Sequence, residues 1–362
     1  MAAHSDREEA GDWTPHGLAA RAAGADRRAR NVVAMASADL AVGEVDRPDE
    51  HTRLALGRHC RAAVSAAEAA IRRHALRLLA DQMTAARAEG LLQPTEAVSA
   101  QLAASGLLRD TDLIGEWLAR VRQDMLVAAL PVAVNGPDEP SLLARLSLAP
   151  DAPVARAAAA LLAADSRRRD QFERGEPDGA ELPPALHARL VWWVAAAMRG
   201  GAHDGARDHA LAEAAARCLA AQEDGDRADM LAMRLAAAID PRPAEIASLL
   251  VEAIGDRRLG FFIALIAHML DLPFDQARTI VLEPEGDRLW LALRALKLDR
   301  PSIARIGLAL GEADPARDIE VFADALDAIV AVPAAEAHAA LMPLTLDPRF
   351  LAAIRMVEEG GR

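Results

Sequence analysis

The chain has 362 residues, of which 52% are apolar and 26% charged, so it can bury a sizeable core and is too apolar for a disordered chain. Aromatic residues make up 3% and tyrosine is absent, which argues against an all-β protein because strands favour β-branched and aromatic side chains. The formal net charge of −13 opposes non-specific nucleic-acid binding, which depends on basic side chains that replace counterions.

The first segment, residues 1–45, is rich in Ala, Arg and Asp and has weak periodicity. We expect a flexible tail with one marginal helix around Leu18 to Leu40. From residue 46 onward, Pro, Asp or Ser recurs at the start of short apolar-periodic segments, as is typical of helix N-termini. The sequence therefore predicts an all-helical domain over residues 46–358, with a sub-boundary near residues 200–206.

One predicted helix shows its buried face directly in the sequence. Ile114, Trp117, Leu118 and Val121 follow the i, i+3, i+4, i+7 spacing of an amphipathic helix.

Two segments suggest internal repeats. Residues 68–80 and 151–162 both resemble the second helix of a HEAT-type repeat, in which Val or Ile is followed by Arg and then by Ala and Leu at core spacing. Arg72 and Arg156 are 84 residues apart, which is twice a period of about 42 residues. The pattern predicts a HEAT-like α-solenoid of stacked helical hairpins, with about 14 to 17 helices in roughly 7 or 8 hairpins.

A longer resemblance covers the second half of the chain. Residues 182–199, which contain Trp192 and Trp193, are similar to the central motif of a bacterial domain-of-unknown-function family, number 2336. Residues 261–267 and 289–296 are similar to later segments of that family. The resemblance spans about residues 46–350 and implies an all-helical, HEAT-like architecture. It implies no activity, and residues 1–45 have no counterpart in it.

The pair Trp192 and Trp193 is the most specific local feature. At helical spacing, Trp193 joins Leu190 and Val194 on a core stripe, whereas Trp192 lies about 100° away. On the same side of the helix lie Arg189, three residues before it, and Arg199, seven residues after it. Because Trp and Arg are enriched at interface hot spots, Arg189, Trp192 and Arg199 are candidate partner-binding residues. The alternative is that Trp192 packs against a neighbouring repeat.

A second tryptophan also has two interpretations. Trp290, Arg294 and Lys297 share one helix face, so an arginine could lie over the indole as a cation–π pair. We favour structural packing, because neighbouring leucines already supply a core stripe. His268 lies in an apolar run and is expected to be a hydrogen-bonded core residue.

The sequence predicts no catalytic, cofactor or metal site, and hence no enzyme. His59 and Cys60 are adjacent and diverge on a helix, and the spacing of His203 and His209 matches no known zinc motif. Neither a phosphate-binding glycine loop nor a nucleophile elbow is present. The two cysteines, Cys60 and Cys218, suit a reducing cytoplasm.

These features predict a cytoplasmic, non-enzymatic scaffold or adaptor that binds a protein partner, with no membrane insertion and no nucleic acid. The start of the sequence is polar and acidic rather than a signal peptide, and the strongest apolar run, residues 259–272, is too short to span a bilayer. The alternative is a helical nucleic-acid binder or enzyme that uses Arg72, Arg73 and Arg77. These lie in residues 51–100, which carry seven Arg against four acids.

Overall fold

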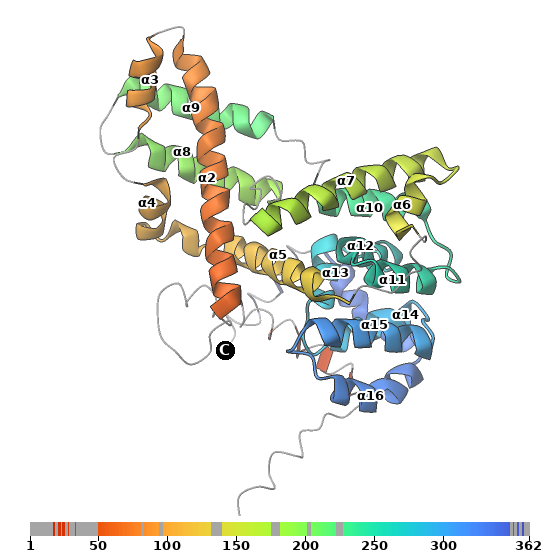
Figure 1. Cartoon of the computed structure of the whole chain (residues 1–362). Coiled ribbons are helices and arrows are strands. Elements are labelled where there is room, and N and C mark those ends of the chain that lie inside the picture. Colours follow the sequence, from red (N-terminus) through yellow and green to blue (C-terminus); the bar gives the residue numbers. More distant parts are fainter. Residues whose placement is uncertain are drawn as a thin grey trace, which may run out of the picture. The chain divides into compact units, whose positions relative to one another are not determined.

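The computed structural model describes residues 50–80, 83–93, 97–131, 140–174, 182–200, 204–221 and 227–347, with single positions between 17 and 33 and between 350 and 357. Within these ranges the secondary structure is helical and contains no strand (Figure 1). The prediction of an all-α protein is confirmed. The described ranges contain sixteen α-helices, α2 to α17, and the sequence predicted about 14 to 17.

The helices form two compact units that interleave along the chain. Unit 1 comprises residues 1–30, 125–159 and 232–362, and unit 2 comprises residues 31–124 and 160–231. Points of division fall inside α5 (Thr111–Ala129), α7 (Ala152–Arg174) and α10 (Ala228–Ile239). The predicted sub-boundary near residues 200–206 falls inside unit 2, and the predicted domain limits stay predictions.

Part of the predicted N-terminal tail is helical and packed. Leu18 and Ala25 are each 1% exposed and Ala22 is 8% exposed, which places them in the core of unit 1. Most other residues of the predicted tail, including the stretch from 34 to 45, lie outside the described part of the chain.

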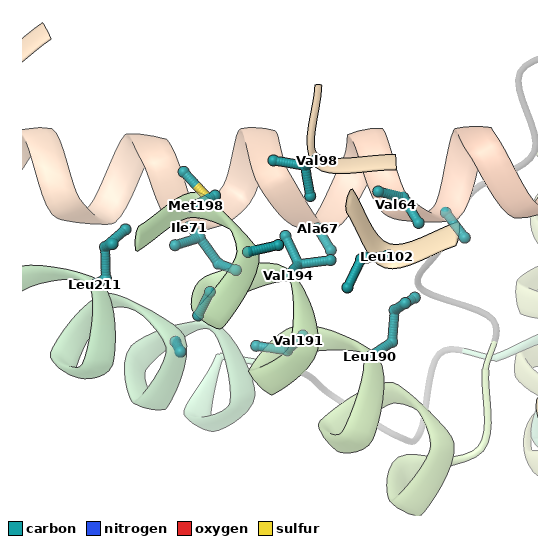
Figure 2. Packing of buried hydrophobic residues seen from close by; sticks show 14 of the residues in the cluster. Val64, Ala67, Ile71, Val98, Leu102, Leu190, Val191, Val194, Met198 and Leu211 are labelled. Carbon is teal, nitrogen blue, oxygen red and sulfur yellow. The ribbon is translucent and has the colours of Figure 1, made fainter. Parts of the chain in front are cut away.

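Unit 2 is organised around one long helix, α2 (Glu50–Ala80). Val64, Ala67 and Ile71 lie on its buried stripe because they recur at helical spacing. Figure 2 shows this stripe facing apolar side chains from three later helices. Besides parts of α5, α7 and α10, unit 2 also contains α3 (Ala85–Leu91), α4 (Val98–Ala104), the 3₁₀ helix η1 (Leu107–Arg109), α8 (Pro184–Arg199) and α9 (Gly205–Ala220).

The pairing of α2 differs from the predicted repeat stack. In a solenoid each repeat contacts only its sequence neighbours. Here α2 packs against α8 and α9, which begin more than a hundred residues after α2 ends. The two arginines that suggested a repeat fall in different units, Arg72 in unit 2 and Arg156 in unit 1, and the solenoid arrangement stays a prediction.

The amphipathic helix predicted around Ile114 is confirmed. It is α5, and Ile114, Trp117, Leu118 and Val121 are all buried, with exposed fractions of 3% or less. Leu113, the residue directly before Ile114, is buried with them.

Unit 1 contains a series of short helices, some of which pack on their sequence neighbours and some on helices further along the chain, such as α11 on α15. Pairs α11–α12, α12–α13, α13–α14 and α15–α16 are in contact, and α14 also contacts α17. The helices are α6 (Leu142–Ser147), α11 (Ile246–Gly255), α12 (Leu259–Met269), α13 (Phe274–Val281), α14 (Asp287–Ala295), α15 (Arg300–Ala313), α16 (Ile319–Ala331), α17 (Ala334–Leu341) and the 3₁₀ helix η4 (Met342–Thr345).

Sharp bends separate consecutive helices of unit 1. The α12–α13 pair is bent by 118° and the α16–α17 pair by 105°, and each pair reaches the length and apolar composition of a membrane span. Throughout the described ranges, no single helix is long and apolar enough to cross a membrane.

Candidate functional site

Trp192 is an exposed aromatic side chain on a helix that is otherwise well packed. Its exposed fraction is 45%, whereas Val191 and Val194 on either side are 1% and 0% exposed. The helical period explains this contrast, because the face of α8 that meets α2 carries Leu190, Val191 and Val194 and turns position 192 outward. Trp192 is therefore accessible, as a partner-binding residue must be, and the contact itself stays a prediction.

Both arginines that flank Trp192 are engaged within unit 2. Arg189 Nη1 lies 2.6 Å from Asp110 Oδ2 and 3.3 Å from Asp112 Oδ2. Arg199 Nε lies 2.9 Å from Asp208 Oδ2 on α9. The two guanidinium groups thus tie α8 to the start of α5 and to α9, and they remain about one third exposed, at 36% and 39%. These ion pairs hold α8, and with it Trp192, in place within unit 2.

Trp193 is less buried than the sequence indicated. It packs at the edge of the apolar cluster of unit 2 and is only partly buried. The helical period places it correctly on the inner side, but α8 lies against α2 and α9 through Val191, Val194 and Met198, so Trp193 falls at the border of that contact.

The basic window of residues 51–100 presents fewer free guanidinium groups than its charge suggests. Arg72 Nη2 lies 2.6 Å from Glu68 Oε1, and its Nη1 donates to the carbonyl of Leu92 at 3.0 Å. Arg72 therefore joins α2 to the end of α3. Arg73 and Arg77 are exposed on α2.

Unit 1 contains a pocket that the sequence analysis did not anticipate. Its volume is about 310 Å³, and it lies among the N-terminal helical positions, the loop before α14, and helices α14, α15 and α16. Its walls include the aromatic pair Trp290 and Phe322, the glycines Gly307 and Gly311, and, among three arginines, Arg21 and Arg28.

The arginines of this pocket belong to a buried ionic network. Arg21 Nη2 lies 2.8 Å from Asp287 Oδ1, while Arg28 Nη2 lies 3.2 Å from both Asp287 Oδ2 and Glu283 Oε1. Arg288 Nε donates to Glu283 Oε2 at 2.8 Å. The two carboxylates are 3% and 4% exposed. Burial raises the pKa of Glu283, and the positive charge of Arg288 only partly opposes that effect.

Sequence reasoning missed this network because its members are far apart in the chain. Arg21 and Asp287 are separated by 266 positions, and charged pairs leave no periodic pattern. A signal was present only in the acidic loop of residues 283–287, which directly precedes a helix containing Arg288 and Trp290.

The packing interpretation of Trp290 is confirmed. Its ring lies 4.7 Å from that of Phe322, centroid to centroid, and Arg294 turns away to donate to the carbonyls of Val332 and Leu298. His268 is hydrogen-bonded as expected, with Nε2 3.0 Å from Asp240 Oδ1, but it lies half-buried at the end of α12 rather than in the core.

The described part of the chain contains no group of three or more His, Cys, Asp or Glu side chains that could hold a metal ion. His203, one of the four residues considered for a metal site, lies outside the described residues.

Comparison with known proteins gives no match to a family model, a curated protein or a solved structure. The resemblance of residues 182–199 to domain-of-unknown-function family 2336 accordingly stays a prediction.

Proposed function

We propose that the protein is a non-enzymatic adaptor that binds a protein partner through the surface around Trp192 on α8. The proposal includes a HEAT-like origin of its helical hairpins and the relationship to family 2336. Neighbour-on-neighbour packing of the short helices α11 to α14, and of α15 on α16, supports that origin, because repeat proteins are built in this way.

The observation that carries the proposal is the exposure of Trp192 on a fixed helix. A partly exposed tryptophan offers a large apolar area, and such residues dominate the binding energy of many interfaces. The ion pairs of Arg189 and Arg199 hold the helix on both sides of it. A rigid, preorganised helix loses little conformational entropy on binding.

The charge around Trp192 indicates what the partner presents. The two arginines are matched by Asp110, Asp112 and Asp208, so the local surface has no excess of positive charge. We therefore expect the partner to contact Trp192 with an apolar side chain rather than to bind through charge alone. Both cysteines, Cys60 and Cys218, are free thiols, which fits the cytoplasmic location included in the proposal.

The test is affinity capture with the full chain followed by measurement of the dissociation constant for the recovered protein. Trp192→Ala should weaken binding by at least about 1 kcal/mol, or roughly fivefold. Leu54→Ala is the matched control, because Leu54 is an apolar side chain of unit 2 that is 57% exposed on α2. Equal affinities for the two variants would contradict the proposal.

The nucleic-acid alternative predicts a different result from the same preparation. Retention on DNA that falls as salt is added, and that is lost with Arg73→Ala and Arg77→Ala rather than with Trp192→Ala, would favour the basic face of α2. That result would overturn the adaptor proposal.

A further inference from the structure

The pocket of unit 1 has an apolar wall whose shape is fixed by the backbone. Trp290 and Phe322 form a tilted ring pair with centroids 4.7 Å apart. A Cβ atom at Gly307 would lie 2.1 Å from Phe322 Cζ, and one at Gly311 would lie 2.6 Å from Ile319 Cγ1. Only glycine at these two positions lets α15 approach α16 this closely, so the wall is preformed.

The pocket lining also carries three arginines, Arg21, Arg28 and Arg317, and three acids, Glu285, Asp287 and Asp318. Arg21 and Arg28 are 26% and 38% exposed, whereas the carboxylates that hold them, Asp287 and Glu283, are 3% and 4% exposed. A ligand entering from solvent therefore meets guanidinium groups before it meets these acids. The one acid of the pocket rim near Arg28 is Glu285, which is 49% exposed and lies 3.5 Å from Arg28 Nε.

Arg28 makes its contacts within the protein through two of its three guanidinium nitrogens. Its contacts with Glu283, Asp287 and the carbonyl of Arg21 all use Nη2, and its contact with Glu285 uses Nε. Those contacts leave the Nη1 group for a ligand oxygen. Because buried carboxylates already fix the guanidinium plane, binding an anion there costs little side-chain ordering.

The acids that line the pocket are each engaged within the protein, Asp287 and Glu285 by arginines and Asp318 by backbone amides. Three guanidinium groups, those of Arg21, Arg28 and Arg288, surround the two buried carboxylates of Glu283 and Asp287. The other acid that lines the pocket near its aromatic wall, Asp318, accepts hydrogen bonds from the backbone of α16 and acts as its N-cap.

We propose that this pocket binds a small organic anion, with a flat apolar body against Trp290 and Phe322 and a carboxylate or phosphate group at Arg28. The volume of about 310 Å³ is at the lower end of the range for ligand sites, so it suits a small ligand with a single ring. The site is independent of the Trp192 surface, which belongs to unit 2.

The test is isothermal titration calorimetry of the full chain with phenylacetate as the probe. Phenylacetate should bind, acetate should bind at least tenfold more weakly because it lacks the ring, and benzylamine should give no binding because its charge is reversed. Phenyl phosphate distinguishes the two acid groups, and binding of either anion supports the site. Absence of binding for both anions, or equal binding of benzylamine, would overturn it.

Matched variants separate the pocket from general effects of charge. Val321 lines the pocket and is 45% exposed, and it lies outside the ionic network, so Val321→Glu should fold normally. It should weaken phenylacetate binding at least tenfold by placing a negative charge at the rim. Leu308→Glu is the control, because Leu308 is 44% exposed on α15 and does not line the pocket. Equal weakening by both variants would show that the pocket is not the binding site.

A direct variant completes the test. Arg28→Gln removes the guanidinium group proposed to hold the anion, and it should also weaken binding at least tenfold. Arg300→Gln, which breaks the exposed pair of Arg300 with Asp327 in the same unit, should leave binding unchanged. Unaltered affinity in Arg28→Gln, with a melting temperature equal to that of the unmodified protein, would contradict the assigned role.

Discussion

The rings of Trp290 and Phe322 lie 4.7 Å apart, centroid to centroid, with their planes tilted by 32°, and this contact joins α14 to α16. Two glycines make room for the pair. A Cβ atom at Gly286, which has a φ of +71°, would lie 2.9 Å from the Trp290 ring, and one at Gly307 would lie 2.1 Å from Phe322 Cζ. The aromatic contact therefore depends on the absence of side chains at two positions that are far apart in sequence from each other.

The first prediction concerns Gly307. Gly307→Ala should lower the free energy of unfolding by about 1–3 kcal/mol, because the added methyl group forces Phe322 or α15 to move. Urea unfolding followed by circular dichroism measures this change. Gly90→Ala is the control, since a Cβ at this position of α3 meets nothing within 4 Å and should stabilise the helix by about 0.5–1 kcal/mol. Equal effects of the two substitutions would contradict the crowding argument.

The second prediction concerns the C-terminal ends of α12 and α14, which have the same backbone conformation. Asp271 and Lys297 have φ values of +53° and +61°, and the amides that follow them donate back to the carbonyls of Ala267 and Leu293, at 2.9 and 3.0 Å. This is the helix-ending motif in which glycine is preferred, because a Cβ atom disfavours the left-handed conformation.

Lys297 is exposed, so its substitution tests the backbone alone. Lys297→Gly should raise the free energy of unfolding by up to about 1 kcal/mol, whereas Lys297→Ala should leave it nearly unchanged because alanine keeps the Cβ atom. Thermal unfolding of the three proteins measures the difference. Stabilisation by alanine equal to that by glycine would show that loss of the lysine charge is the cause.

Local periodicity identified the helices and their buried faces, because both depend on residues within a few turns. The spacing of Ile114, Trp117 and Val121 correctly predicted the inner face of α5. It did not indicate which helix covers a given face, and so the pairing of α2 with α8 and α9 was missed. That pairing depends on the summed fit of many small apolar groups, such as Ala67 and Ala75, which look alike in any alanine-rich helix.

At the candidate sites, too, the sequence indicated the face of a helix but not the residues that contact it. The angle of Trp192 on α8, away from the core stripe, was predicted from spacing, but whether its side chain is exposed or packs on a neighbouring helix was left open. The partners of Arg189 and Arg199 were not predicted, because Asp110 is 79 residues away from Arg189 and ion pairs have no sequence period. The pocket network escaped sequence analysis for the same reason, since Arg28 and Glu283 meet across 255 positions.

The third prediction compares the two adjacent tryptophans. Trp193→Ala should lower the free energy of unfolding by about 2 kcal/mol, below the range for a fully buried tryptophan, because Trp193 lies at the edge of the cluster. Trp192→Ala should change stability by less than about 0.5 kcal/mol, as is usual for exposed positions. Denaturant unfolding of both variants is the measurement. If Trp192→Ala is the more destabilising of the two, then Trp192 is a packing residue and the binding surface is wrongly assigned.

The last prediction concerns Cys60 on α2, which is partly buried among the apolar side chains of unit 2. Burial raises the pKa of its thiol to about 11 from an ordinary value of 9.0, and Arg61 only partly opposes the effect. The native protein therefore keeps the Cys60 proton at pH values where the unfolded chain releases it. Stability should fall as the pH rises from 9 to 11, because the unfolded state binds fewer protons in that window.

Two measurements check this behaviour in a Cys218→Ser background, which leaves Cys60 as the sole thiol. Alkylation of Cys60 by iodoacetamide at pH 8 should be at least tenfold slower in the native protein than in urea, because only the thiolate reacts. Replacement of Cys60 by alanine should reduce the loss of stability between pH 9 and pH 11. Rapid alkylation of the native protein at pH 8, with the fold retained, would show that the thiol is not shielded by the packing of α2.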